Sequence, residues 1–134
     1  MDNKRVFLGL DVGGQRIGVA LGDSIGRIAQ PLATVATASA ASDIQTVITE
    51  HNVTDFVVGR PRNQSGDTTA QTQTVEAFAR QILQQFKLPL HWQDESLTSV
   101  IAEERLNQRR KPYSKGDIDA EAASIILQDF LEQI

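Results

Sequence analysis

The sequence contains no cysteine and only two histidines, His51 and His91, which lie far apart in the chain. The absence of cysteine excludes disulfide bonds, thiolate nucleophiles and cysteine-based zinc sites. Two isolated histidines do not make a histidine-rich metal site. Any metal ion bound by this chain must therefore be held through oxygen.

Long apolar runs are also missing. The amino-terminal segment MDNKRVFLGLDVGG has only a short apolar stretch before Asp11, and nothing approaches the ~18 apolar residues of a membrane span. We therefore expect a cytoplasmic protein with no membrane partner.

The charges nearly balance, with 13 Lys+Arg against 17 Asp+Glu and a formal net charge of −4. This balance excludes a generally cationic nucleic-acid coat protein but leaves room for a local basic patch. The length of 134 residues and the 40% hydrophobic content predict one globular domain over residues 1–134.

The first third of the chain predicts three antiparallel strands. An apolar run over residues 5–11 is followed by a glycine pair, and residues 16–23 then alternate large apolar and small side chains. These two segments predict a hairpin. Residues 28–35 form a third extended segment, in which Pro31 suits an edge strand because proline cannot donate to a ladder.

The remainder alternates helices and strands. Helical periodicity predicts a helix around Ile44–Ile48 and a longer one from Val75 to Phe86. Two more helices are expected at 98–109 and 118–132. Strands are expected at 55–59 and 88–92. Strand–helix–strand spacing implies parallel pairing through a right-handed crossover. The predicted class is α/β, with a mixed five-stranded sheet of three antiparallel then two parallel strands, flanked by helices.

Acidic residues stand at the ends of two predicted strands. Asp11 ends the first strand, where it either serves a site or accepts backbone N–H groups in the turn. Asp94 and Glu95 end another strand, and because consecutive strand residues point to opposite faces, at most one of them is expected to share a face with Asp11. Asp94 or Ser96 would alternatively cap the next helix.

Asp119 begins the apolar stripe of the last helix, which continues through Ala122, Ala123, Ile126 and Phe130. A carboxylate aimed at a core costs several kcal/mol unless it is paired or binds a cation. The alternative is an exposed first-turn acid favoured by the helix dipole. Asp117 is the expected N-cap of this helix.

Carboxylates from two strand ends and one helix start, brought to one sheet edge, would hold hard divalent cations. Two such ions about 3.5–4 Å apart can activate water and stabilise the leaving oxygen of a phosphodiester. This donor set fits phosphoryl chemistry better than zinc hydrolysis.

Four segments in this order resemble the YqgF/RuvX family of ribonuclease H-like fold, described as Holliday junction resolvases and as nucleases that trim the 5′ end of pre-16S rRNA. They are LGLDVGGQRIGVALGD at 8–23, VVGRPRNQSGD at 57–67, QDESLTSVIAEERL at 93–106 and KGDIDAEAASIILQDFLE at 115–132. The resemblance covers nearly the whole chain, from about Arg5 to Glu132.

The resemblance implies catalytic residues at Asp11, Glu95 and Asp119, with Asp94 beside Glu95 as a further metal ligand, and a two-ion Mg²⁺ or Mn²⁺ site. Glu95 is preferred to Asp94 because its longer side chain can reach back from a strand end. The chain departs from the family pattern at two positions: Ser96 replaces an arginine, and Arg60 replaces a leucine.

Five cations and no acid lie between Arg105 and Lys115. They form either a solvated helix end or a surface that holds phosphates beside the metal site. Tyr113 would either stack on an unpaired base or cap a helix. The loop that contains Arg60, Arg62, Asn63 and Gly66 would either contact a phosphate or only connect two elements. Trp92 is expected in the core. The candidate substrate contacts are Arg16, Arg60, Arg62, Arg110, Lys111 and Lys115.

These residues predict a metal-dependent endonuclease for structured nucleic acid, with precursor 16S rRNA as the expected partner and a DNA junction as the alternative. Two further alternatives stay open. DVGG followed by RIGVA also resembles the phosphate-binding hairpin of the actin-like ATPases, and a non-catalytic RNA-binding assembly factor would use the same basic residues. The expected oligomeric state is a monomer or a homodimer. A junction resolvase needs two active sites, so a strict monomer would count against that role.

Overall fold

One mixed sheet forms the centre of the molecule. The computed structural model describes residues 3–61, 70–95, 98–109 and 114–134, with the side chains at 95 and 98–100 outside the description. The strands are β1 (Val6–Val12), β2 (Arg16–Asp23), β3 (Gln30–Ala36), β4 (Asp55–Pro61) and β5 (Leu90–Glu95). Their order is β3-β2-β1-β4-β5, antiparallel among the first three and parallel from β1 to β4 and β5. The predicted α/β class and strand pairing are confirmed.

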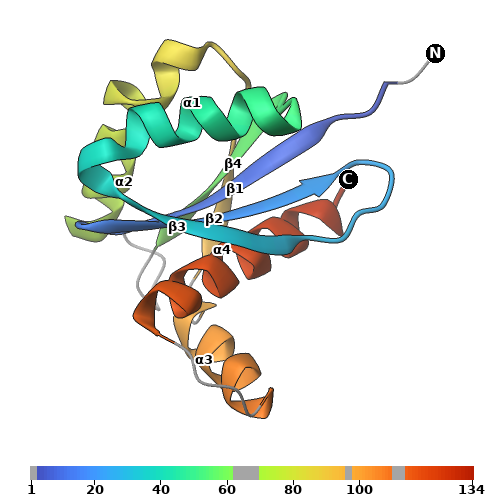
Figure 1. Ribbon diagram of the computed structural model, residues 1–134, viewed down its shortest axis with the longest axis vertical. Helices are drawn as coiled ribbons and strands as arrows, with labels where there is room; N and C mark the ends of the chain where they lie inside the picture. The colour runs from blue at the N-terminus through green and yellow to red at the C-terminus, as the bar shows by residue number, and fades with distance from the viewer. Residues whose placement is uncertain (1–2, 62–69, 96–97, 110–113) are drawn as a thin grey trace.

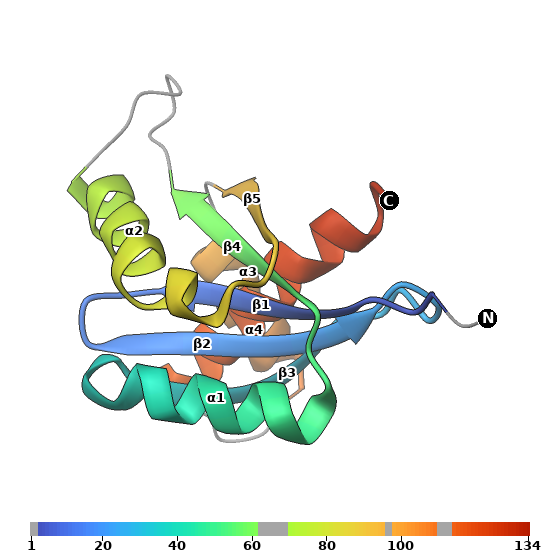
Figure 2. The same cartoon turned by 90° about the horizontal axis from the view of Figure 1, so that it is seen from above.

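Helices cover both faces of this sheet (Figures 1 and 2). α1 (Ala40–His51) and α2 (Ala70–Gln81) lie on one face, and α4 (Lys115–Leu131) crosses the other. α3 (Thr98–Gln108) packs on α4 at the end of the molecule, and two short 3-10 helices are η1 (Thr37–Ser39) and η2 (Leu83–Phe86). In the described part of the chain, no helix is long and apolar enough to cross a membrane.

Alternation along β1 explains both layers. Leu8 and Leu10 are fully buried among side chains of α1 and α2. Phe7 points to the opposite face, where it joins the apolar cluster of α4. Because successive strand residues alternate, Gly9 and Asp11 share the face of Phe7 and look toward α4.

Glycines let α4 approach the sheet closely. A Cβ built on Gly18 of β2 would lie 1.8 Å from the carbonyl oxygen of Asp119, and one on Gly9 would lie 2.8 Å from Cβ of Leu127. No side chain fits at either separation without movement of the helix. The small-residue face predicted for residues 16–23 is therefore the surface on which α4 packs.

Several predicted boundaries shift. α4 begins at Lys115, three residues before the predicted start, and its N-cap is Ser114, so the prediction of Asp117 as N-cap is wrong. Asp117 instead occupies the third helical position of a capping box, with its carboxylate accepting the Ser114 N–H at 2.9 Å. The box uses both residues, which explains the earlier start.

The other shifts have local causes. The helix predicted through Phe86 ends at Gln81, and η2 carries the chain on with Leu83 still buried. β3 begins at Gln30 because Asp23 Oδ1 accepts N–H groups of Ile25 and Gly26 and forms a turn before it. β5 runs to residue 95, so the acidic pair lies within the strand.

Replacing Gly18 with alanine tests the close approach of α4. The new methyl group must push the helix start off β2, so we expect Gly18→Ala to lower the free energy of unfolding by about 1–3 kcal/mol or more. Urea unfolding followed by circular dichroism measures the change. Gly14→Ala is the matched control, because nothing lies within 4 Å of a Cβ there; equal stability of the two variants would contradict the packing argument.

Candidate active site at the carboxyl end of the first strand

Asp11 and Asp119 meet where β1 ends. Asp11 pairs across the hairpin with Gly18, and directly paired residues of antiparallel strands point to the same face. Gly18 lies against the backbone of Asp119, in the first turns of α4. The glycine therefore places the two carboxylates side by side between the sheet and the helix.

The pair is electrostatically strained. Burial and, as the smaller cause, the negative charge of Asp119 together raise the pKa of Asp11 to about 6. A buried carboxylate beside a second one is costly without a nearby cation. The arrangement is thus suited to a cation rather than to fold stability.

Arg16 supplies one positive charge. Its Nε donates to Asp119 Oδ2 at 2.6 Å, and its side chain is 46% exposed. The turn that carries it is closed by a hydrogen bond from Gly13 N–H to the Arg16 carbonyl at 2.9 Å. A cavity of about 290 Å³ opens between this turn and Asp119. Arg16, expected as a substrate contact, therefore lies at the site and pairs with one of its acids.

Hydrogen bonds also fix the neighbouring strand ends. Gln71 in the first turn of α2 donates from Nε2 to the carbonyl of Val12 at 2.9 Å. Thr72 of the same turn donates from Oγ1 to the carbonyl of Pro61 at the end of β4. One helical turn thus ties the carboxyl ends of β1 and β4 together.

Asp94 of β5 lies on the side of the sheet away from Asp11. His91 packs against Phe130 of α4, whereas Trp92 packs against the core on the α1–α2 side. Because side chains alternate along a strand, Asp94 shares the side of Trp92, and its register partner on β4 is Arg60. Asp94 is exposed, and the Glu95 side chain lies outside the described residues. Among the described residues, no group of three acids or histidines comes together as a metal site.

The remaining predicted contacts divide into two sets. Lys115 is exposed in the first turn of α4, and Arg60 donates from Nη2 to Glu76 at 2.8 Å while its guanidinium lies over the ring of Trp92. Trp92 packs against the core as expected but keeps some exposure. Lying outside the described residues are the others: Arg62, Asn63, Gly66, Ser96, Arg110, Lys111 and Tyr113.

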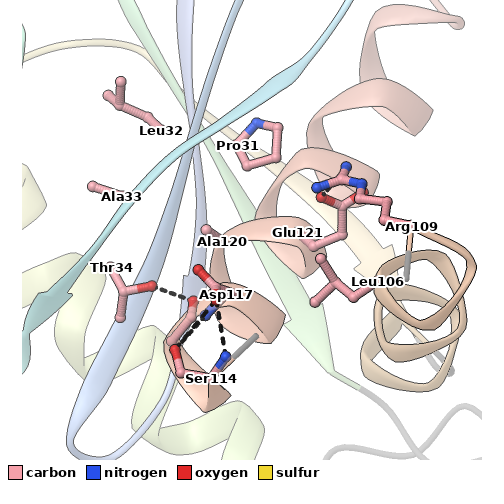
Figure 3. Close-up of a pocket in the computed structure, with 11 residues that line it drawn as sticks. Pro31, Leu32, Ala33, Thr34, Leu106, Arg109, Ser114, Asp117, Ala120 and Glu121 are labelled. Carbon is pink, nitrogen blue, oxygen red and sulfur yellow. Dashed lines mark hydrogen bonds and ion pairs between the residues drawn. The ribbon is translucent and has the colours of Figure 1, made fainter. Parts of the chain in front are cut away.

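Sequence reasoning missed a buried acid, Glu121, on the side of α4 away from Asp119. Only 3% of Glu121 is exposed, and its carboxylate binds Arg105 Nη1 at 3.4 Å and Arg109 Nη2 at 3.1 Å. These pairs fasten α3 to α4 beside a cavity of about 510 Å³ that also borders β3 (Figure 3). A glutamate inside the stretch 120–127, which is otherwise apolar except for Ser124, was the available signal.

A second buried carboxylate, Asp55, has the opposite electrostatics. It accepts hydrogen bonds from Arg5 at 2.8 Å and Thr54 at 2.6 Å, and His91 Nε2 lies 2.8 Å away. Burial acts to raise the pKa of Asp55, yet these neighbours hold it below its ordinary value. Asp55 is a satisfied structural acid, and Asp11 is not.

The comparisons with known proteins identify the fold and the family of this chain. The fold is the ribonuclease H-like α/β fold: the solved structure titled "T. thermophilus RuvC in complex with Holliday junction substrate" superposes with a TM-score of 0.58 over 96% of this chain and 94% of that one, at 14% identity. The chain belongs to the RuvX family, whose model, described as Holliday junction resolvase, matches residues 5–133.

Two relatives carry the name "Putative pre-16S rRNA nuclease". The protein from Synechocystis sp. is 43% identical, covering 98% of this chain and 90% of its own. The protein from Moorella thermoacetica is 39% identical, covering 96% of this chain and 95% of its own. The resemblance read from the four sequence segments is confirmed.

The raised pKa of Asp11 predicts a pH-dependent cost. An acid whose folded-state pKa exceeds its unfolded value destabilises the fold once ionised, so the cost is absent below about pH 4 and complete above about pH 7. We expect Asp11→Asn, in EDTA, to raise the free energy of unfolding by roughly 1–3 kcal/mol at pH 7.5 and by about a third as much at pH 4.5. Urea titrations at both pH values measure this. The exposed control Glu104→Gln should show no such dependence; an Asn variant that is less stable at pH 7.5 would contradict the assignment.

Proposed function

We propose that this protein is a Mg²⁺- or Mn²⁺-dependent endonuclease that acts on structured RNA, with the 5′ end of precursor 16S rRNA as substrate. The observation that carries the proposal is the half-buried pair Asp11 and Asp119 at a strand end, in which the charge of Asp119 helps to raise the pKa of Asp11. Family membership and the names of the two relatives support the same chemistry and the same substrate.

In this proposal the metal ligands are Asp11, Asp119 and Glu95, with Asp94 as the alternative at the end of β5. The donor set is all carboxylate oxygen, which suits hard divalent cations. Asp94 shares the side of Trp92, which is the side of the sheet away from Asp11, so the described geometry counts against Asp94 and supports Glu95. When bound, two ions would supply activation of water and stabilisation of the leaving oxygen.

The chain's own residues would bind and orient the phosphodiester. Arg16 sits on the rim of the cavity that includes Asp119, where it can reach a phosphate once a metal ion takes over the neutralisation of that acid. Lys115 is exposed one turn before Asp119 and lies on the same helix end. Arg62, Arg110 and Lys111 complete the proposed set of phosphate contacts.

The family description favours a second candidate, cleavage of a four-way DNA junction. Two symmetric cuts need two active sites, so this role requires a homodimer. Both substrates present the same phosphodiester to the carboxylates, and groove shape and 2′-hydroxyl contacts would discriminate between them.

Cleavage assays on a pre-16S 5′-leader fragment and on a four-way junction, each with and without Mn²⁺, test the proposal. We expect metal-dependent cleavage of the leader, lost by at least 100-fold in Asp11→Asn because a neutral amide binds a divalent cation poorly. Glu104→Gln, an exposed surface change, should cut like the wild type.

Each other result assigns a different role. Cleavage of the junction alone would favour the resolvase, provided that the protein is dimeric by light scattering. Binding of the leader without any cleavage would favour a non-catalytic assembly factor. Undiminished cleavage by the folded Asp11→Asn variant would show that the proposed metal site is wrong.

A further inference from the structure

A third cavity, also of about 510 Å³, lies on the face of the sheet opposite Asp11. Leu88, Leu90 and Trp92, from the edge strand β5 and the segment before it, form its floor. Residues of α2 and η2 form its wall. β5 has β4 on one side only, so this groove follows an outer edge of the sheet (Figure 2). Nothing in the proposed cleavage chemistry uses it.

The lining of the groove is positively charged, although the chain as a whole is negative. Its walls carry three cations, Arg60, Arg80 and Lys87, against one acid, Glu76, on a chain with a formal net charge of −4. Glu76 is already paired with Arg60. Arg80 and Lys87 are exposed, so two positive charges face solvent beside an apolar floor. This combination is complementary to an anionic ligand with an apolar, flat body.

The aromatic part of the groove is a stacked pair. The Arg60 guanidinium carbon lies 4.6 Å from the ring centroid of Trp92, and Arg60 Nη2 is held by Glu76 at 2.8 Å. Arg60 Nε has no hydrogen-bond partner among the described residues. Indole rings and guanidinium planes are the surfaces on which unpaired bases stack.

The groove also begins at the edge of the sheet that holds the candidate site. Arg60 and Asp94 are register partners near the carboxyl ends of β4 and β5. The carboxyl end of β1, with Asp11, lies at the same edge because the three strands are parallel. A nucleic-acid strand that leaves the site across this edge would meet Arg60 and Trp92 first, and then Arg80 and Lys87.

We propose that this groove binds a single-stranded segment of the nucleic-acid substrate, with an unpaired base against the Trp92–Arg60 pair and its phosphates beside Arg80 and Lys87. The proposal rests on the proposed function for its substrate class. It would give the protein a preference for substrates in which an unpaired strand flanks the cleaved bond.

Trp92 is the sole tryptophan of the chain, so its fluorescence reports on the groove alone. The probe is a 12-nucleotide single-stranded RNA of mixed sequence, titrated in EDTA so that no cleavage occurs. We expect saturable quenching of Trp92, because a base stacked near the indole alters its emission. Inorganic phosphate at the same phosphate concentration, and a blunt RNA duplex, should quench little.

Matched variants identify the phosphate contacts. Lys87→Gln and Arg80→Gln should each weaken binding about threefold to fivefold and lower the log–log salt slope by about 0.7. Arg27→Gln is the control: Arg27 is exposed on the β2–β3 turn, and its φ of 56° matches the 57° of Lys87. It should leave affinity and slope unchanged.

Several outcomes would overturn the groove assignment. They are RNA binding by anisotropy without any quenching, equal quenching by duplex or phosphate, and equal losses in the Lys87 and Arg27 variants. Trp92 emission that changes with protein concentration alone, together with dimer formation, would assign the groove to a second copy instead.

Failure of this inference is separable from failure of the proposed function. Asp11→Asn should still show wild-type quenching, since Asp11 lies on the other face. A wild type that cleaves nothing but shows the expected quenching would defeat the nuclease and leave the groove standing. Normal cleavage with unquenched Trp92 would do the reverse.

Discussion

The close approach of α4 to the sheet is the constraint on which the candidate site depends. Gly18 has no Cβ, and for that reason the backbone of Asp119 can lie directly on β2. Asp11 is the cross-strand partner of that same glycine. A larger residue there would separate the two acids as well as loosen the helix, so the packing that stabilises this layer also creates the carboxylate pair.

The pKa values of Asp55 and Asp11 are shifted in opposite directions. Both lie on the α4 side of the sheet, toward opposite ends of it. Asp55 is surrounded by donors that lower its pKa, so its charge is compensated within the fold. Asp11 has a raised pKa and a like-charged neighbour, so its charge is uncompensated. Arg16 supplies one positive charge at this pair, through Asp119, and the raised pKa of Asp11 is the physical reason to propose a further cation there.

The sequence predicted most of the architecture because periodicity is local information. Alternation in residues 16–23 and the apolar stripe behind Asp119 indicated the faces that meet, and both are observed to meet. The cap of α4 was misplaced because Ser114 and Asp117 are both good capping residues, and only the backbone shows that they act together. Glu121 and the Arg60–Trp92 stack escaped prediction because their partners, Arg105 and Glu76 among them, come from other elements. Pairings across elements depend on how the helices pack, which no local pattern contains.

An acidic protein can act on nucleic acid if its charges are separated in space. Asp11 and Asp119 concentrate negative charge on one face at the carboxyl edge of the sheet, where divalent cations would reverse its sign. The groove past Arg60 carries its positive charge on the opposite face of the same edge. A phosphate backbone crossing that edge would therefore meet positive charge on both sides, although the net charge of the chain is −4. Because the two surfaces are separated by the sheet, the proposed affinity for a flanking strand and the proposed chemistry at the cleaved bond would change independently, one through Arg80 and Lys87 and the other through the acids beneath α4.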